Sequence, residues 1–216
     1  MSTALTTQAA TPARATTVEE RFVERIQQLC ARSAAARNQL RRTERRRPED
    51  ASRAVHQVVA RWLPDNPSPG RERAYYTVAA LIAAQPNTTH RATDEQTSPE
   101  ADDTEPAARA RTRWANLGGT LARACLGRPA GAKTIGFASA ERHLELICRQ
   151  GLHGLHRHLP TVIRRMSEID ASPDWARLLN DLARWENTPR LVAKQWQQAF
   201  YRTAYELDPD ALETGE

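Results

Sequence analysis

The chain has 216 residues, enough to bury a sizeable core, and this length fits one large domain or two small ones. Alanine, leucine, arginine, glutamate and glutamine dominate its composition while phenylalanine and tyrosine are scarce, which favours helices and argues against a sheet protein. The formal net charge is +5, and the chain outside Asp94–Glu105 carries +11, because that segment holds six carboxylates and no Lys or Arg.

Arginine supplies most of this positive charge. Its planar, permanently charged guanidinium pairs with phosphate oxygens, so a polyanion is the expected partner. Nucleic acid is the first candidate and an acidic protein is the second.

Cysteine usage and hydropathy bear on the compartment. Cys30, Cys125 and Cys148 lie far apart and form no C-x-x-C pattern, so neither a disulfide framework nor a zinc site is expected. No apolar run approaches the ~20 residues that a membrane span requires. The start of the chain lacks the apolar centre of a signal peptide. We therefore expect a cytoplasmic protein without membrane contact, in which residues 1–16 form a disordered tail.

Residues 17–85 are predicted to form an N-terminal helical bundle. Its first helix begins at a capping box made by Thr17 and Glu20, and Phe22 and Ile26 then recur on one side. The helix therefore has one face suited to a core.

Two further helices follow. An alanine- and arginine-rich helix starts at Ala34, has Leu40 as its one substantial apolar residue, and is predicted to end at Pro48. The next runs from about Ala51 to Trp62, before a turn-forming segment rich in proline and asparagine.

A fourth helix carries the apolar series Tyr75, Val78, Ala79 and Ile82. Residues 86–106 are polar, acidic and without periodicity, a composition that cannot bury enough apolar surface to become ordered. We expect a flexible acidic insertion there.

Residues 107–207 are predicted to form a C-terminal helical bundle, with residues 208–216 as a tail. A short helix begins with Trp114 and ends near Gly127. A Gly-rich loop follows, and Ser139 is predicted to cap the next helix. The helix after that contains Pro160, which should either kink it or lie in its first turn.

Two cap-then-proline pairs, Ser172-Pro173 and Thr188-Pro189, begin the last two predicted helices. Trp175, Trp185 and Trp196 fall on their apolar stripes, which indicates core residues in preference to platforms for base stacking. Short connections favour antiparallel neighbours, so the predicted fold class is all-α, with two small helical bundles packed together.

The order of motifs resembles the CasB family, the small subunit of the type I-E CRISPR Cascade complex. The C-terminal signature consists of Asp174-Trp175, Leu178-Leu179-x-Asp181-Leu182, Trp185, Val192, Trp196 and Phe200-Tyr201. Upstream motifs in the same order are Leu40-Arg41-Arg42, the series from Tyr75 to Leu81, Leu117-Gly118-Gly119-Thr120-Leu121-Ala122 and Ser139-Ala140-Glu141-Arg142-His143-Leu144. The resemblance spans roughly Val18 to Tyr201.

This resemblance implies a binding protein without a catalytic site or cofactor. A pair of copies would lie along the inner face of a ribonucleoprotein, among the other Cascade subunits. The implied partners are CRISPR RNA (crRNA) and target DNA, both as the RNA–DNA heteroduplex and as the displaced single strand. A separately recruited helicase-nuclease would do the cutting.

The strongest candidate site is the arginine-rich helix. Guanidinium groups spaced by four residues share one helix face and are suited to track a phosphate backbone. The predicted contacts in this run are Arg37, Arg41, Arg42, Arg45 and Arg46. The alternative is a solvated face whose charges pair internally with Glu44, Glu49 and Asp50.

A second candidate site surrounds the Gly-rich loop and the start of the following helix, where free amide groups attract phosphate. Its predicted contacts are Arg123, Arg128, Lys133 and Arg142. For Arg142 the alternative is an ion pair with Glu141 or Glu145. Arg164 and Arg165 are weaker candidates, since charged residues normally cover the outside of a bundle helix.

Other chemistry has little support. The segment from Gly127 to Thr134 fails the spacing of a phosphate-binding P-loop. The potential metal ligands His143, Cys148, His153, His156 and His158 have no zinc-site spacing, so no metal is expected. Two alternatives to the nucleic-acid binder stay open, a basic helical adaptor for an acidic protein and a nuclease whose site one sequence does not reveal.

Overall fold

The computed structural model describes residues 16–86, 116–129 and 131–212. Within these ranges all regular structure is helical, which confirms the predicted all-α class. The helices are α1 (Val18–Arg32), α2 (Ala34–Arg41), η1 (Pro48–Asp50), α3 (Arg53–Val59), η2 (Ala60–Trp62), α4 (Pro69–Ala84), α6 (Leu117–Leu126), α7 (Phe137–Cys148), α8 (Leu152–Ser167), α9 (Trp175–Trp185), α10 (Pro189–Leu207) and η4 (Pro209–Leu212).

Three predictions fall on the rest of the chain. Residues 1–15 of the expected tail, all of the acidic segment after Pro86, and Trp114 lie outside the described residues. None of the described helices combines the length and apolarity that a bilayer crossing demands.

Helix α1 begins as its sequence predicts. The backbone amide of Glu20 donates to Thr17 Oγ1 at 3.1 Å, and the amide of Thr17 donates to Glu20 Oε2 at 2.8 Å. Both bonds satisfy amides that the first turn of a helix leaves without partners. Phe22 and Ile26 are fully buried, so the predicted apolar face of α1 is part of the core.

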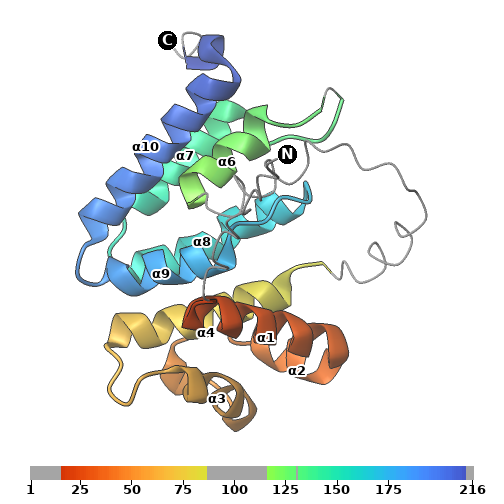
Figure 1. Ribbon diagram of the computed structural model, residues 1–216, viewed down its shortest axis with the longest axis vertical. Helices are drawn as coiled ribbons and strands as arrows, with labels where there is room; N and C mark the ends of the chain where they lie inside the picture. The colour runs from red at the N-terminus through yellow and green to blue at the C-terminus, as the bar shows by residue number, and fades with distance from the viewer. Residues whose placement is uncertain (1–15, 87–115, 130, 213–216) are drawn as a thin grey trace, which may run out of the picture.

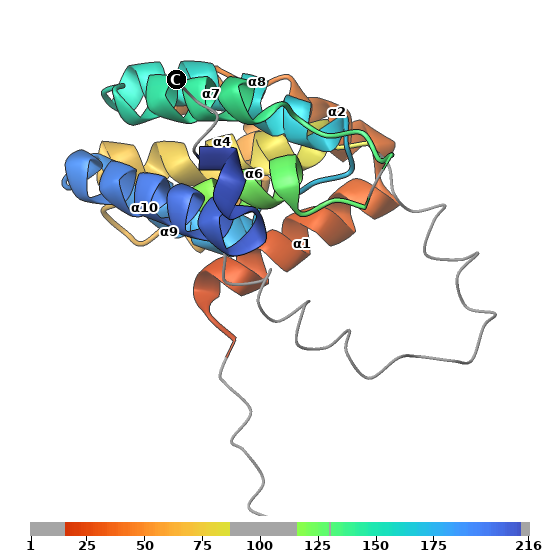
Figure 2. The ribbon, with the colours of Figure 1, turned by 90° about the horizontal axis from the view of Figure 1, so that it is seen from above.

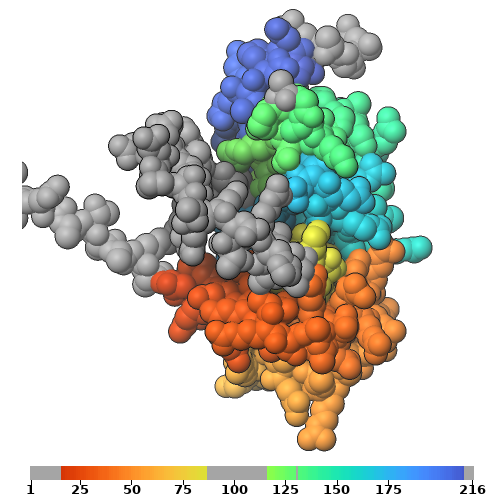
Figure 3. Space-filling view, turned by 90° about the vertical axis from the view of Figure 1, so that its right-hand side faces the viewer, coloured from red at the N-terminus to blue at the C-terminus, as the bar shows by residue number. Residues whose placement is uncertain are grey.

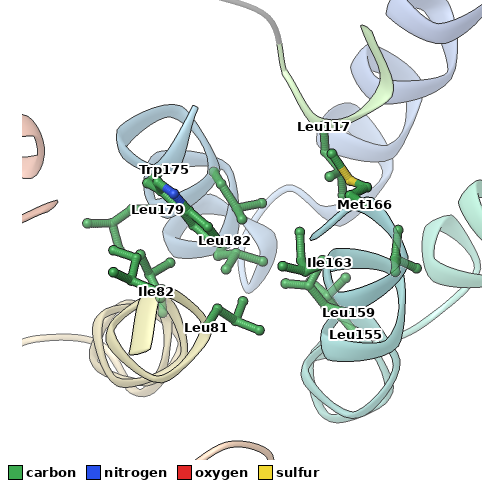
Figure 4. Packing of buried hydrophobic residues seen from close by; sticks show 14 of the residues in the cluster. Leu81, Ile82, Leu117, Leu155, Leu159, Ile163, Met166, Trp175, Leu179 and Leu182 are labelled. Carbon is green, nitrogen blue, oxygen red and sulfur yellow. The ribbon is translucent and has the colours of Figure 1, made fainter. Parts of the chain in front are cut away.

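Helix α4 is the central element of the molecule. It is capped by Ser68, begins with Pro69, and carries buried side chains on every face. Helices α1, α2, α8 and α9 pack around it (Figure 1). Leu81 and Ile82 of α4 lie among apolar side chains of α8 and α9 (Figure 4). The two predicted bundles therefore share one hydrophobic core, and their boundaries stay a prediction.

Helices α6, α7 and α10 form the other end of the molecule, with α6 in close contact with α10 (Figure 1). The rings of Trp185 and Trp196 lie 5.0 Å apart between centroids, and both side chains are almost completely buried. Trp175 is buried as well. The interpretation of these tryptophans as core residues is confirmed.

Several predicted helix boundaries are wrong. Helix α7 starts two residues before Ser139, with Gly136 as its N-cap. Helix α9 is capped by Asp174, whose carboxylate accepts from the Arg177 amide at 2.9 Å, so the Ser172-Pro173 pair lies outside the helix. An aspartate at the N-cap is as favourable as a serine, and the sequence offered both Ser172 and Asp174 as candidates.

Two further boundaries depend on the fold. Helix α2 ends at Arg41 and does not continue to Pro48, and the turn that follows contains Arg45 with a left-handed φ of 67°, which no α-helix accommodates. Pro160 lies inside α8 and not in its first turn. The Thr188-Pro189 start of α10 is confirmed.

Packing of α8 on α4 buries a histidine. His156 is 1% exposed, and its Nδ1 lies 2.8 Å from Thr77 Oγ1. Burial, together with the smaller effects of the charges of Arg73 and His153, lowers its pKa from the usual 6.5 to about 3. The imidazole is therefore neutral in the folded protein at physiological pH.

This histidine predicts acid sensitivity. The unfolded chain binds a proton near pH 6.5 and the folded chain only near pH 3, so stability is greatest above pH 6.5 and falls as the pH decreases. Between pH 7.5 and pH 5 we expect a loss of about 2 kcal/mol in the free energy of unfolding, measured by denaturant titration. His156→Gln should remove that part of the pH dependence. An equal pH dependence in both proteins would contradict the assignment.

Candidate nucleic-acid interface

The turn after α2 presents the first predicted group of arginines. Arg41, Arg42 and Arg46 are exposed, and their side chains have no hydrogen-bond or ion-pair partner among the described residues. Leu40 is 1% exposed and anchors the helix beneath them. These three guanidinium groups are therefore available to an anion from outside.

Arg45 links this turn to the C-terminal half of the chain. Its guanidinium donates to Thr161 Oγ1 on α8 at 3.0 Å, across 116 residues of sequence. The surface of the N-terminal helices, in red and orange, meets the surface of α8, in cyan (Figure 3). We call residues 41–46, which include Arg41, Arg42, Arg45 and Arg46, the arginine turn. The arginine turn and α8 therefore belong to one continuous surface.

Arg37 has a different role from its neighbours. It is half-buried, its Nε donates to the carbonyl of Ala83 at 3.0 Å, and a second nitrogen donates to the carbonyl of Gln85. These carbonyls lie at the C-terminal end of α4, where no later helical amide donates to them. The geometry favours a structural cap at the end of α4 over phosphate contact for Arg37.

Helix α8 contributes a hollow beside Arg45, which we call the basic hollow. Thr161, Arg164, Arg165 and Ser139 line it, and Glu168 is the one carboxylate among its described lining residues. Arg165 donates to Ser139 Oγ at 3.4 Å, which joins α8 to the first turn of α7. Arg164 has no side-chain partner in the described part of the chain. The sequence offered no reason to group these two arginines with Arg45, because one sequence does not show that Thr161 lies next to Arg45.

Two residues of the second predicted group lie next to the basic hollow. Lys133 precedes Thr134, which lines it, and Arg142 lies one helical turn after Ser139. Both side chains are exposed. The structure therefore brings Lys133 and Arg142 near the arginines of α8, and through Thr161 near Arg45.

The alternative ion pairs for Arg142 are not formed. Glu141 accepts a hydrogen bond from the Tyr201 hydroxyl at 2.7 Å, and Glu145 pairs with Arg149. Burial, and after it the hydrogen bond to Glu141 and the charge of that carboxylate, raise the pKa of Tyr201 to about 12. Likewise, within the described residues, no ion pair joins the arginine turn to Glu44, Glu49 or Asp50.

Arg123 and Arg128, at the end of α6 and just after it, are not among the described residues that line the basic hollow. Each is half-buried and has one guanidinium nitrogen that is shielded from solvent without a hydrogen-bond partner. A shielded donor without an acceptor costs free energy, but a nitrogen that solvent does not reach is not accessible to an external anion either, so these two atoms do not mark a phosphate site.

The histidines are divided among separate contacts. His143 Nδ1 lies against the carbonyl of Ser139, and His153 Nδ1 lies against the buried guanidinium of Arg73. Cys148 Sγ is 3.7 Å from the carbonyl of Ala193. In the described ranges no three potential ligands converge on a metal position.

Comparison with known proteins places this arrangement in a family. A family model described as CRISPR-associated protein Cse2 matches residues 36–201. The chain belongs to the Cse2 family. The resemblance to CasB that its motifs carry is confirmed, because solved CasB structures share the fold of this Cse2-family chain.

Three solved structures illustrate the similarity. One described as a CRISPR RNA-guided surveillance complex is 37% identical, with a TM-score of 0.68 over 90% of this chain and 97% of that one. A second, described as the same kind of complex in a pre-nicking state, is 36% identical, with a TM-score of 0.71 over the same shares. CasB from M. ruber is 21% identical, with a TM-score of 0.66 over 89% of this chain and 97% of that one. No curated protein matches the chain.

Proposed function

We propose that this Cse2-family chain is the non-catalytic, nucleic-acid-binding small subunit of a type I-E CRISPR RNA-guided surveillance complex in the cytoplasm. In that role it lines the path of crRNA and target DNA and stabilises the strand that the heteroduplex displaces. Its partners are the other Cascade subunits and a second copy of itself.

The observation that carries this proposal is the continuous surface of unpaired arginines. Arg41, Arg42 and Arg46 come from the turn after α2, Arg164 comes from α8, and Arg45 joins the two through Thr161. A row of cations without internal partners is the footprint expected of phosphate binding. The identity of 37% to a chain of a surveillance complex, over nearly the full length of both, supports the assembly.

Two measurements test the proposal. Tagged protein should co-purify with a crRNA-containing complex from cells that carry the CRISPR system. Purified protein should shift single-stranded and duplex oligonucleotides without cleaving them, with or without Mg²⁺. Cleavage would favour a nuclease, and capture of an acidic protein without nucleic-acid binding would favour an adaptor.

Replacing Arg41 and Arg42 by alanine should weaken binding about equally for unrelated sequences, because the phosphate backbone is the same everywhere. The slope of log affinity against log salt should decrease by roughly 0.7 to 0.9 for each lost contact. Folding should change by less than ~0.5 kcal/mol, since both side chains are exposed. Fluorescence anisotropy at several salt concentrations measures both quantities.

The matched control is Arg190→Ala with Arg202→Ala, which removes the same charge from exposed positions of α10. This variant should keep the wild-type salt slope. If the two double variants lose affinity and slope to the same extent, net charge and not the arginine turn determines binding.

A further inference from the structure

A second hollow, of about 460 Å³, lies where the loop before α4 meets the corner between α9 and α10. Both segments lie at the left-hand end of the molecule (Figure 1), and the view from above also places the loop before α4 beside α10 and α9 (Figure 2). The hollow shares no lining residue with the basic hollow. Its volume is within the range of sites for small ligands, roughly 300 to 1,000 Å³. We call it the amide hollow, after Asn66, Asn180 and Asn187 in its wall.

Two arginines in the wall of the amide hollow form ion pairs with carboxylates that do not line it. Arg71 pairs with Glu19 at 3.5 Å, and Arg184 lies 3.9 Å from the buried carboxylate of Asp181. Their side chains remain 44% and 43% exposed. No aspartate or glutamate is among the described residues that line the hollow. Cations that are already held in place lose little freedom when they bind an anion.

Three asparagine side chains add hydrogen-bonding groups to the wall of the amide hollow. The side chains of Asn66, Asn180 and Asn187 are exposed and have no hydrogen-bond partner within the described ranges. Each offers one acceptor and two donor hydrogens. The edge of a nucleobase presents donors and acceptors side by side, and asparagine is one of the side chains that pair with it. Unpaired bases also stack on guanidinium planes.

A protein partner fits this hollow less well. Protein interfaces centre on aromatic and apolar anchors in closely packed pockets, whereas the described lining here is amide, hydroxyl, guanidinium, proline and a single alanine. We infer that the amide hollow binds one unpaired nucleotide, with its base edge on Asn180 and Asn187 and its phosphate on Arg71 and Arg184. This inference rests on the proposed nucleic-acid-binding function and adds a contact that distinguishes bases.

The test removes amides and no charge. Binding of the full-length wild type and of Asn180→Ala with Asn187→Ala is measured by anisotropy at one salt concentration, using single strands of dA, dC or dT and an abasic strand of equal length. Wild type should bind at least one base-bearing strand about tenfold more tightly than the abasic strand, the discrimination typical of one good base contact. The variant should bind all strands as it binds the abasic one, with an unchanged salt slope.

The control is Gln57→Ala with Gln198→Ala, two exposed amides outside the hollow, which should keep the preference. Melting temperatures establish that all the variants fold. Wild-type binding without base preference, or a preference that the Asn180 and Asn187 variant retains, overturns the inference while the proposed function stands. Absence of any strand binding overturns both. If the variant binds strands as wild type does but no longer co-purifies with other subunits, the hollow is a protein contact.

Discussion

Replacing Trp196 by alanine should lower the free energy of unfolding by about 3 to 5 kcal/mol, the usual cost of truncating a fully buried tryptophan. The side chain is completely buried against Trp185, so its removal leaves a large cavity. Its Nε1 also donates to Asp181 Oδ2 at 2.7 Å. Burial raises the pKa of that carboxyl, while the Trp196 hydrogen bond and then the charges of Arg177 and Arg184 lower it. Denaturant titration measures the loss.

Trp196→Phe separates the two contributions. Phenylalanine keeps most of the ring volume but has no N–H group, so the buried carboxylate of Asp181 loses a donor. An unsatisfied buried group costs about 1 to 3 kcal/mol. If Trp196→Ala keeps the wild-type melting temperature and loses nucleic-acid binding, the tryptophan is a stacking platform and the core assignment is wrong.

Gly118→Ala should be at least as damaging as an ordinary overpacked core substitution, which costs about 1 to 3 kcal/mol. A Cβ added at Gly118 would lie 1.8 Å from the backbone carbonyl oxygen of Trp196. Since that atom belongs to the backbone of α10, the two helices must move apart to admit a methyl group. Thermal unfolding should show a clear decrease in melting temperature.

The matched control is Gly136→Ala. A Cβ there meets no atom within 4 Å, and the φ of −58° suits alanine. That change should alter stability by less than about 1 kcal/mol, because the lower entropy of the unfolded chain opposes the weaker preference for alanine at the N-cap of α7. Similar melting temperatures for both variants would show that α6 and α10 are not closely packed at Gly118.

Features that depend on neighbouring residues were predictable from the sequence. The capping box at Thr17 and the Thr188-Pro189 start satisfy local backbone geometry, so their chemistry is visible in a few residues. The tryptophan stripes predicted burial because helical periodicity places Trp185 with leucines on one face of α9 and Trp196 with Val192 and Phe200 on one face of α10.

Features that depend on residues far apart in the chain were not predictable from the sequence. In the turn that follows α2, Arg45 bonds to Thr161 on α8, and no pattern near residue 45 indicates that partner. The same reason explains why Arg37 looked like its neighbours, although it caps the end of α4. The amide hollow combines residues from the loop before α4 and from α9, which the chain order separates widely.

The position of α4 at the centre of the core has a consequence for synthesis. Helix α4 leaves the ribosome before α8 and α9 are made, although both are needed to cover its apolar faces. A nascent chain that has emerged only as far as α4 can pack α1 and α2 on this helix, but it leaves exposed the apolar faces that α8 and α9 cover in the complete fold. Such a chain is a substrate for chaperones and proteases, and truncation anywhere before α9 leaves it in that state permanently.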